Sequence, residues 1–331
     1  MGTIIRAAIT GTGSYLPEKI LTNADLEKMV ETSDEWITTR TGVKERRQAA
    51  PNEAASDLGA EAARRALKQA KALPEEIDCL IVATISGDMP FPATACFIQH
   101  LIGAKNAAAF DISAACSGFI YALNIAKSFI ETKTYKKVLV VAVDVLSRIT
   151  DWSDRGTCVL FGDGAGAAVL EPTKDENGII SVYIGSDGSA TDLLKLPGGG
   201  SRLPVSAETL KNRDHYIKMS GNEIFKLAVT AMINSAQKAM AMANLKCEDI
   251  KLLIPHQANI RIIEATAKRL KLPVERIFVN IQKYGNMSGA TTAIGLDEAF
   301  REGRIKKGDY VELVAFGAGL TWGAAVIKWG I

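Results

Sequence analysis

The sequence predicts an α/β protein made of two similar halves fused in one chain. Short apolar runs alternate with amphipathic segments along the whole length, as in folds that alternate strands and helices. The second half also replays the first in the same order. Three pairs of segments match: Glu76–Ile81 with Asp249–Ile254, Phe110–Gly118 with Val279–Gly289, and Gly166–Leu170 with Gly323–Ile327. We therefore expect an N-terminal half at 1–175 and a C-terminal half at 176–331.

Composition limits the classes of partner and compartment. The 331 residues include 39 basic and 37 acidic side chains, so the net charge of +2 gives no overall attraction to nucleic acid or to a membrane surface. The five cysteines are odd in number and scattered without a C-x-x-C pair, which argues against a disulfide framework and a metal site. A cytoplasmic location fits this cysteine usage. The longest apolar run, Val138–Val143, is broken by Asp144 and is too short to cross a bilayer.

The first elements are read from apolar periodicity and from helix start signals. A strand is predicted at Ile4–Gly11, and Gly11 with Gly13 is interpreted as a turn, because no helix follows as a dinucleotide site would require. Asn23 and Ser56 are expected to cap helices. The further elements expected before residue 113 are helices at 23–30, 57–71 and 94–101 and strands at 77–83 and 107–112.

The segment Ala107–Ile130 predicts a buried strand, a tight turn and an amphipathic helix. Small residues at Ser113–Gly118 leave the sulfur of Cys116 uncovered at the helix N-terminus, where the unpaired N–H groups favour thiolate over thiol. A nucleophile on a strand-to-helix turn resembles the hydrolase elbow. Free cysteines are also frequently plain buried hydrophobes, so this stretch alone leaves both interpretations open.

The middle of the chain predicts close packing and then a loose segment. Gly162–Gly166 runs into a strand and not into a helix, so we interpret its glycines as close backbone packing and not as a phosphate loop. Between Asn177 and Tyr216 no strong helical period appears, which predicts a mobile connection or lid. Gly221–Ala243 then has the apolar spacing of a long helix.

Two polar residues of the second half follow predicted strands, as Cys116 does in the first. His256 comes after the strand Lys251–Ile254, and Asn286 comes after a strand expected at Ile277–Ile281. Ligands of such folds bind beyond the carboxyl ends of strands, where the units meet. We therefore expect Cys116, His256 and Asn286 to converge, although a histidine or a turn asparagine alone is more commonly structural.

The motifs around these residues resemble the β-ketoacyl-[acyl-carrier-protein] synthase III family. They are TSDEWI and RTGV at 32–43, DISAACSGF around Cys116, DRGT at 154–157, FGDGAGA at 161–167, PHQAN at 255–259, GNMSGA at 285–290 and FGAGLTWG at 316–323. The resemblance covers essentially the whole chain. It implies a thiolase-like fold layered as α/β/α/β/α and a condensing enzyme that initiates type II fatty-acid synthesis.

The same resemblance implies roles for particular residues. Cys116, His256 and Asn286 would be the catalytic triad, and the backbones of Cys116 and Ala318 would form the oxyanion hole. Family members commonly carry three consecutive glycines where this chain has Gly317-Ala318-Gly319, so the Ala318 methyl group puts the width of the acyl pocket in doubt. The coenzyme A site would consist of Trp36, Arg40 and Arg155. Phe91 would reach from a dimer interface toward the partner's acyl pocket.

The resemblance also implies partners. The substrates would be a short acyl-coenzyme A and malonyl-acyl-carrier protein, the enzyme would be a homodimer, and no cofactor or metal would be needed. The helix predicted at Asn259–Leu272 leaves basic side chains toward solvent, and an ordinary solvated helix face is the alternative. We expect this surface to bind the acidic carrier protein through Lys226, Arg261, Lys268 and Arg269.

Three other functions compete with this one. A thiolase shares the fold but uses a second cysteine near the C-terminus, and no cysteine follows Cys247. A papain-like peptidase has the same order of Cys, His and Asn, but its cysteine lies near the mature N-terminus in C-G-[SA]-C-[WY]. A non-catalytic partner subunit would not need the intact set of Cys116, His256 and Asn286.

Overall fold

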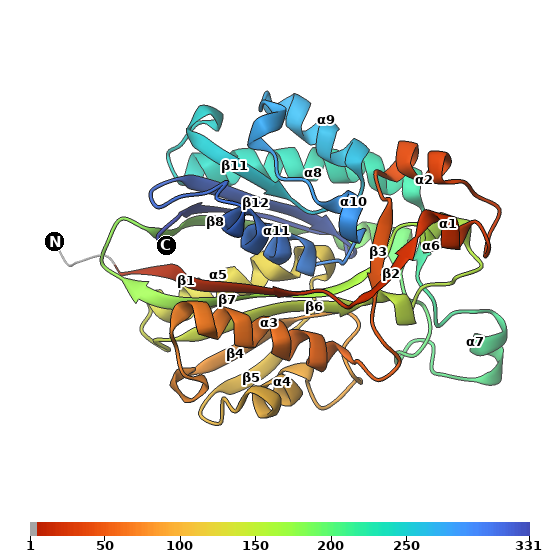
Figure 1. Ribbon diagram of the computed structural model, residues 1–331, viewed down its shortest axis with the longest axis horizontal. Helices are drawn as coiled ribbons and strands as arrows, with labels where there is room; N and C mark the ends of the chain where they lie inside the picture. Colours follow the sequence, from red (N-terminus) through yellow and green to blue (C-terminus); the bar gives the residue numbers. More distant parts are fainter. Residues whose placement is uncertain (1–4) are drawn as a thin grey trace.

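The chain folds into five layers in which helices and sheets alternate. The structure is a computed structural model that describes residues 5–331. From the bottom of Figure 1 upward, the layers are outer helices, a first sheet, two central helices, a second sheet and a second set of outer helices. The predicted α/β/α/β/α arrangement is therefore confirmed. The N-terminal end of the first predicted strand, Ile4, lies outside the described residues.

The first sheet has the strand order β1-β7-β6-β4-β5. Strand β4 pairs in parallel with both β5 and β6, whereas β7 runs antiparallel to β1 and to β6. The strands β4 and β6 are buried along their whole length, as their continuous apolar sequences predict. The five strands are β1 (Arg6–Tyr15), β4 (Cys79–Ala83), β5 (Ala108–Ile112), β6 (Val138–Val145) and β7 (Asp163–Thr173).

The second sheet repeats this order with one strand fewer. Its order is β8-β13-β12-β11, and a single parallel bridge from Leu253 to Ile277 stands where β5 stands in the first sheet. Strand β11 is parallel to β12, and β13 runs antiparallel to both of its neighbours. The strands are β8 (Gly178–Ser186), β11 (Ile250–Pro255), β12 (Tyr310–Gly317) and β13 (Thr321–Lys328).

The strand predicted at Ile277–Ile281 is wrong, and the side chain of Gln257 explains why. This buried amide accepts hydrogen bonds from the backbone N–H groups of Asn280 and Ile281 through Oε1, at 3.1 and 3.2 Å. Its Nε2 donates to the carbonyl of Phe278 at 3.2 Å. The backbone groups that a strand would pair are thus taken by one side chain, and the chain turns into the short helix α10 (Ile281–Tyr284).

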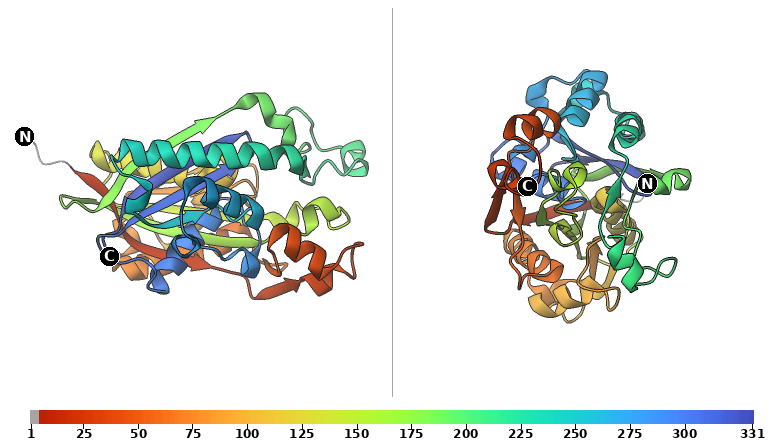
Figure 2. Two further views of the ribbon diagram at one scale, coloured as in Figure 1. Left: turned by 90° about the horizontal axis from the view of Figure 1, so that it is seen from above. Right: turned by 90° about the vertical axis from the view of Figure 1, so that its right-hand side faces the viewer.

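Two central helices separate the sheets, and four further helices cover their outer faces. The central pair contacts strands of both sheets: α5 (Gly118–Glu131) and α11 (Ala290–Arg301). In the left view of Figure 2, α8 is the long helix that lies across the second sheet. The outer helices are α3 (Ala55–Ala70) and α4 (Thr94–Ile102) on the first sheet, and α8 (Gly221–Met242) with α9 (Ile260–Leu270) on the second.

Gly11 and Gly13 are strand residues and not a turn, which corrects the sequence interpretation. Both lie inside β1, directly under α3. A Cβ atom added to either glycine would lie 2.4 Å from a carbonyl oxygen of α3, that of Ala66 or of Ala62. The glycines therefore allow the helix backbone to approach the strand backbone.

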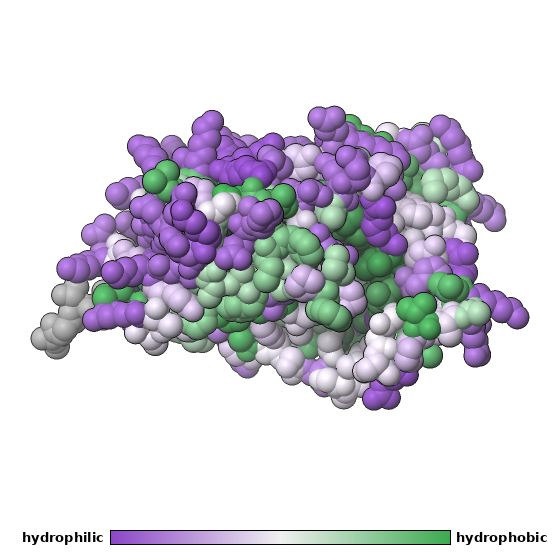
Figure 3. Space-filling model, turned by 90° about the horizontal axis from the view of Figure 1, so that it is seen from below, coloured by the Kyte–Doolittle hydropathy of each residue, from purple (hydrophilic) through white to green (hydrophobic). Residues whose placement is uncertain are grey.

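The two edges of the first sheet differ. Along β1, the Gln69 side chain accepts from the Thr12 N–H at 3.2 Å, and Arg65 donates to the Ser14 carbonyl at 2.7 Å. The β5 edge is more exposed than the other strands of this sheet, beginning with the exposed Ala108. Figure 3 shows apolar side chains gathered in the middle of this lower face. The large exposed apolar residues of the segment before α4 and of α4 itself are Ile85, Met89, Phe91 and Leu101.

The remaining elements form an extension beside the layers. Both predicted helix caps are wrong. Thr22, not Asn23, caps the first helix. Ala54 stands at the N-cap position of α3, and the Ser56 hydroxyl donates to Asp88 instead. Part of the segment predicted to be loose is strand β8, and the rest of that segment has only short elements. The short elements are β2 (Lys19–Thr22), α1 (Asn23–Leu26), α2 (Asp34–Thr41), β3 (Glu45–Gln48), α6 (Arg155–Cys158), β9 (Leu194–Lys195), α7 (Ala207–Lys211) and β10 (Lys218–Met219). Within residues 5–331, no helix has both the length and the apolar character that a membrane crossing requires.

Candidate active site

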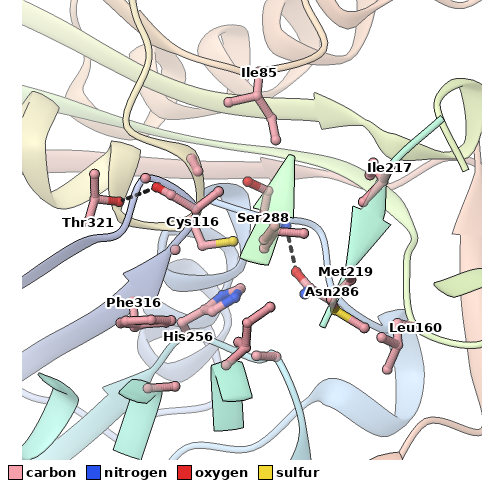
Figure 4. A pocket seen from close by; sticks show the side chains of 18 of the residues that line it. Ile85, Cys116, Leu160, Ile217, Met219, His256, Asn286, Ser288, Phe316 and Thr321 are labelled. Atoms are coloured by element: carbon pink, nitrogen blue, oxygen red, sulfur yellow. Dashed lines mark hydrogen bonds between the residues drawn. The ribbon is translucent and has the colours of Figure 1, made fainter. Parts of the chain in front are cut away.

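A cavity of about 440 Å³ lies where the two halves meet, and its lining comes from both. It brings together Cys116, His256 and Asn286, the three residues that the sequence predicts to converge. All three are less than one-tenth exposed. Most of the lining is apolar, and Figure 4 shows the Cys116 sulfur turned toward His256 and Ser288. An apolar ligand therefore has a site beside a thiol.

Cys116 lies on a sharp turn between β5 and α5, as predicted. The turn Ala115–Ser117 is a single 3₁₀ turn, and Ala115 adopts the left-handed conformation with φ of 46°. Helix α5 begins at Gly118, where a Cβ atom would lie 2.9 Å from the Cβ of Ala83. Small residues in this turn thus let the nucleophile approach the sheet closely while its sulfur faces the cavity.

The prediction that this turn favours the thiolate is wrong for the resting site. Burial raises the pKa of Cys116 to about 12, and the nearby Asp144 carboxyl group adds to the increase. The loss of water around the sulfur disfavours its charged form. The resting group is therefore a thiol.

His256 follows β11 and is oriented by α11. Its Nδ1 lies 2.6 Å from the hydroxyl oxygen of Thr291, which is buried. The Thr291 hydroxyl also lies 2.9 Å from the Ser288 carbonyl, so its one proton goes either to that carbonyl or to Nδ1. In the second arrangement, the ring carries its proton on Nε2 and can donate into the cavity. Burial lowers the pKa of His256 to about 3, so the ring is neutral at physiological pH.

Asn286 is oriented by the turn that begins α11. Its Oδ1 accepts the Ser288 N–H at 2.8 Å, a contact drawn in Figure 4. The backbone of Asn286 also bonds to Leu160 and Gly162, which ties this turn to the first half. This bond fixes the orientation of the side-chain amide, and its Nδ2 group is a hydrogen-bond donor on the cavity side. One turn, Ser288–Thr291, thus orients both His256 and Asn286.

Ala318 lies beside Cys116 because the end of β12 approaches the Cys116 turn closely. A Cβ atom on Gly317 would lie 2.6 Å from the Cys116 nitrogen, so no larger residue fits there. The Thr321 hydroxyl donates to the carbonyls of Ala114 and Ala318, at 2.9 and 3.1 Å, and joins the two segments. Ala318 lines the cavity. Cys116 and Ala318 thus line the same cavity, and their role as an oxyanion hole stays a prediction.

Trp36, Arg40 and Arg155 also come together, outside the cavity. The guanidinium carbons of Arg40 and Arg155 lie 4.9 and 4.8 Å from the centre of the Trp36 ring. The Arg40 carbonyl accepts a hydrogen bond at 3.0 Å from Asn259, which lines the cavity. This aromatic and cationic cluster therefore lies one contact away from the cavity wall.

The predicted docking residues separate into two groups. Lys226 and Arg261 lie near the cavity, because Arg261 stacks at 5.8 Å on Phe225, a lining residue next to Lys226. Lys268 and Arg269 occupy the last turn of α9, about 12 Å farther along the helix axis. All four side chains are exposed. Phe91, predicted for the acyl pocket, does not line the cavity of its own chain and is 83% exposed.

Sequence reasoning missed two residues of the site, Asp144 and Thr291. Asp144 is buried at the end of β6, and Thr291 is buried in the first turn of α11. A signal for Asp144 was present, since a single carboxyl group interrupts an otherwise apolar strand. Thr291 had no comparable signal, because its contact with His256 spans 35 residues.

Comparisons with known proteins identify the family of this chain. The family model "3-Oxoacyl-[acyl-carrier-protein (ACP)] synthase III" matches residues 110–188, and the model of its C-terminal part matches residues 240–329. The chain is 58% identical to the β-ketoacyl-[acyl-carrier-protein] synthase III of Caldanaerobacter subterraneus and 56% identical to that of Clostridioides difficile, each over 98% of both chains.

Solved structures give the same result. The synthase III from Aquifex aeolicus is 48% identical with a TM-score of 0.90, over 98% of this chain and 100% of that one. The enzyme from Thermus thermophilus is 45% identical with a TM-score of 0.91, over 98% and 99%. The OleA protein of Xanthomonas campestris, at 21% identity and a TM-score of 0.84, shares the fold. This chain belongs to the β-ketoacyl-[acyl-carrier-protein] synthase III family.

Proposed function

We propose that this chain is the condensing acyltransferase that starts type II fatty-acid synthesis. It would transfer a short acyl group, such as acetyl, from coenzyme A to Cys116, and then condense it with malonyl-acyl-carrier protein to give 3-oxoacyl-carrier protein and CO2. The observation that carries this proposal is the meeting of Cys116, His256 and Asn286 in one apolar cavity. Family membership supports it and disfavours the peptidase and thiolase alternatives.

In the first half-reaction, the thiolate of Cys116 attacks the thioester carbonyl. The acyl group moves from one sulfur to another, so the covalent intermediate keeps the activation of the thioester. Backbone N–H groups of Cys116 and Ala318 would hold the oxyanion of the tetrahedral intermediate. Each such donor contributes on the order of 3 kcal/mol in comparable sites.

In the second half-reaction, malonyl-thioester loses CO2 and negative charge develops on its thioester oxygen. Nε2 of His256 and Nδ2 of Asn286 would donate hydrogen bonds to that oxygen. The neutral state of His256 is compatible with this role, since the donor needs no positive charge. The resulting carbanion attacks the acyl group on Cys116 and releases the cysteine sulfur. No step requires a cofactor.

The surroundings of the cavity support the proposed substrates and assembly. The Trp36 cluster offers an aromatic face and two guanidinium groups to the nucleotide end of acyl-coenzyme A. Lys226 and Arg261 offer positive charge to an acidic carrier protein. The exposed β5 edge and Phe91 suit a second copy of the chain, which makes a homodimer part of this proposal. A cytoplasmic location follows from the cysteine usage.

The experiment measures the two half-reactions separately. Intact-mass spectrometry follows acyl-enzyme formation from acetyl-coenzyme A, and labelled CO2 release follows decarboxylation of malonyl-carrier protein. His256→Ala and Asn286→Ala should retain acylation and lose about 10² to 10³ in decarboxylation rate, since each removes one oxyanion donor. Cys116→Ala should form no acyl-enzyme and retain some decarboxylation. Wild-type decarboxylation in Asn286→Ala together with failed acylation would invert the assigned roles.

A further inference from the structure

Gln257 is a fully buried amide to which the steps above assign no role. Its exposed fraction is 0%, and it is not among the residues that line the cavity. Its Nε2 donates to the carbonyls of Pro255 and Phe278, at 2.7 and 3.2 Å. Its Oε1 accepts from the N–H groups of Asn280 and Ile281, at 3.1 and 3.2 Å. Both donors and both lone pairs of the amide are thus used, and one side chain joins the end of β11 to the segment that enters α10.

The two segments that Gln257 joins carry the two donors proposed for decarboxylation. His256 lies between the end of β11 and Gln257. Asn286 comes shortly after α10, and α10 is held against α11 because Nδ2 of Asn280 donates to Oε2 of Glu298 at 2.8 Å. A shift of either segment would therefore move one donor relative to the other.

The first half of the chain shows why the second half needs this connection. In the first sheet, β5 pairs with β4 along its whole length and leads to Cys116. In the second sheet, the single bridge from Leu253 to Ile277 stands in that place, and the chain then turns into α10 and leads to Asn286. Gln257 thus supplies the hydrogen bonds that strand pairing supplies in the first half.

We propose that Gln257 is a positioning residue that sets His256 and Asn286 at the spacing at which both can donate to one thioester oxygen. The proposal rests on the proposed function, because it concerns the second of its two half-reactions. Gln257 does not line the cavity, so it acts through the two donors and not on the substrate. Such donors must lie about 2.7–3.1 Å from the oxyanion, and a misplacement of about 1 Å can cost about 100-fold in rate.

The Ser288–Thr291 turn and Gln257 hold the two donors in different ways. The turn contacts their side chains, at Nδ1 of His256 and at Oδ1 of Asn286. The Gln257 side chain instead binds the backbone of both segments. Without Gln257 the donors would keep their orientation and lose their spacing, so we expect an effect on the rate of decarboxylation and little effect on substrate binding.

The test replaces the amide and follows the two half-reactions separately. Gln257→Met keeps the length of the side chain and removes its four hydrogen bonds. The kcat for CO2 release from malonyl-carrier protein should fall about 100-fold with little change in KM, because a misplaced donor is lost mainly in the transition state. Acetyl transfer from coenzyme A to Cys116, followed by intact-mass spectrometry, should keep the wild-type rate, since neither donor belongs to the oxyanion hole proposed for that step.

Gln257→Glu adds a pH response that a merely structural role would not give. The protonated carboxyl group can still donate to the Pro255 carbonyl, whereas the ionised group has no donor and brings a negative charge to that carbonyl. The rate of CO2 release relative to the wild type should therefore rise as the pH falls from about 9 to about 6, because burial favours the neutral carboxyl group. Acetyl transfer should show no such change. The ionisable groups on the elements around it are His256, Lys283, Tyr284, Glu298 and Arg304. The wild type carries the same groups, so the ratio of the two rates removes their own titration.

Gln99→Met is the matched control. The Gln99 amide also donates to two carbonyls, those of Ala104 and Ala107 at 3.2 and 2.8 Å, but it lies on α4 and does not line the cavity. This variant should leave both half-reactions unchanged. Equal losses of acetyl transfer and CO2 release in Gln257→Met, unchanged CO2 release in that variant, or a Gln257→Glu ratio that stays low at pH 6 overturns the positioning role alone. A wild-type enzyme that takes up no acetyl group or releases no CO2 overturns the proposed function with it.

Discussion

Glu312 is a fully buried carboxyl group on β12, in the layer between the second sheet and its outer helices. Its exposed fraction is 0%, and neither of its oxygens has a hydrogen-bond partner in the described structure. Burial raises its pKa well above the ordinary value, so the group is protonated in the folded protein. The unfolded chain, in contrast, exposes an ordinary glutamate.

This difference predicts a loss of stability as the pH rises. Below the unfolded pKa both states carry the proton, and above it the unfolded state loses the proton while the folded state keeps it. The folded protein therefore loses up to about 1.4 kcal/mol per pH unit until the folded pKa is reached. Glu312→Gln removes this group, so its urea midpoint should fall less than that of the wild type between pH 5 and pH 8. Glu302→Gln, which changes an exposed glutamate, is the control and should behave as the wild type does. If the urea midpoints of the wild type and of Glu312→Gln fall by the same amount, the assignment is wrong.

The surroundings of Trp36 predict an effect of this residue on the KM for acetyl-coenzyme A. Its ring holds two guanidinium groups within 5 Å, and a nucleotide base can stack in the same cluster. Trp36→Ala should raise the KM for acetyl-coenzyme A about tenfold and change kcat little, since Trp36 does not line the cavity that holds Cys116. Acetyl-pantetheine lacks the nucleotide and is the control substrate. An equal rise of KM for both substrates would mean that the cluster serves the fold and not the nucleotide.

At the scale of elements, the contact between α2 and α9 joins two predicted binding surfaces. Gly42, which ends α2, is so close to Ile260 that a Cβ atom would lie 2.6 Å from the Ile260 side chain. The Asn259 side chain donates to the Arg40 carbonyl at 3.0 Å. The helix with Trp36 and the helix with Arg261 therefore form one rigid rim beside the cavity.

This geometry predicts unequal contributions from the basic residues of α9. Arg261→Glu, beside the cavity, should lower kcat/KM for malonyl-carrier protein by at least tenfold at low salt, and increasing salt should reduce the difference. Arg269→Glu is the matched charge reversal on the last turn of the same helix and should have a smaller effect. Steady-state rates at several salt concentrations test both variants. Equal effects would indicate a general response to charge instead of a docking site.

Local patterns predicted most elements, and contacts between distant segments account for the exceptions. The alternation of strands and helices, together with the internal repeat, was sufficient to predict two similar α/β halves and the meeting of Cys116, His256 and Asn286. The order of the five layers was implied by the family resemblance. The strand at Ile277–Ile281 could not be excluded from its own sequence, because Gln257 takes its backbone groups. The resting state of Cys116 was likewise mispredicted, because burial depends on what the whole fold brings around the sulfur.

At the scale of the whole molecule, the β5 edge predicts the state of assembly. Its backbone is less covered than that of the neighbouring strands, and the exposed apolar residues Met89 and Phe91 precede the helix beside it. The wild-type protein should sediment as two copies at micromolar concentration. Ala108→Lys places a charge on this edge and should shift the protein toward one copy, since charged edges resist pairing. Ala241→Lys, on the exposed face of α8, should leave the mass unchanged, and a wild-type monomer would refute the prediction.

The unequal edges of the first sheet also limit how far such an assembly can grow. A sheet with two open edges can add a further copy at each end and so extend without limit, as fibrils do. Here, side chains of Gln69 and Arg65 occupy backbone groups along β1. In the first sheet, edge pairing is thus favoured at β5, and two copies joined there leave no second β5 edge to recruit a third. A dimer joined through β5 would therefore be closed to further addition at this sheet, which would protect the exposed apolar surface from polymerisation.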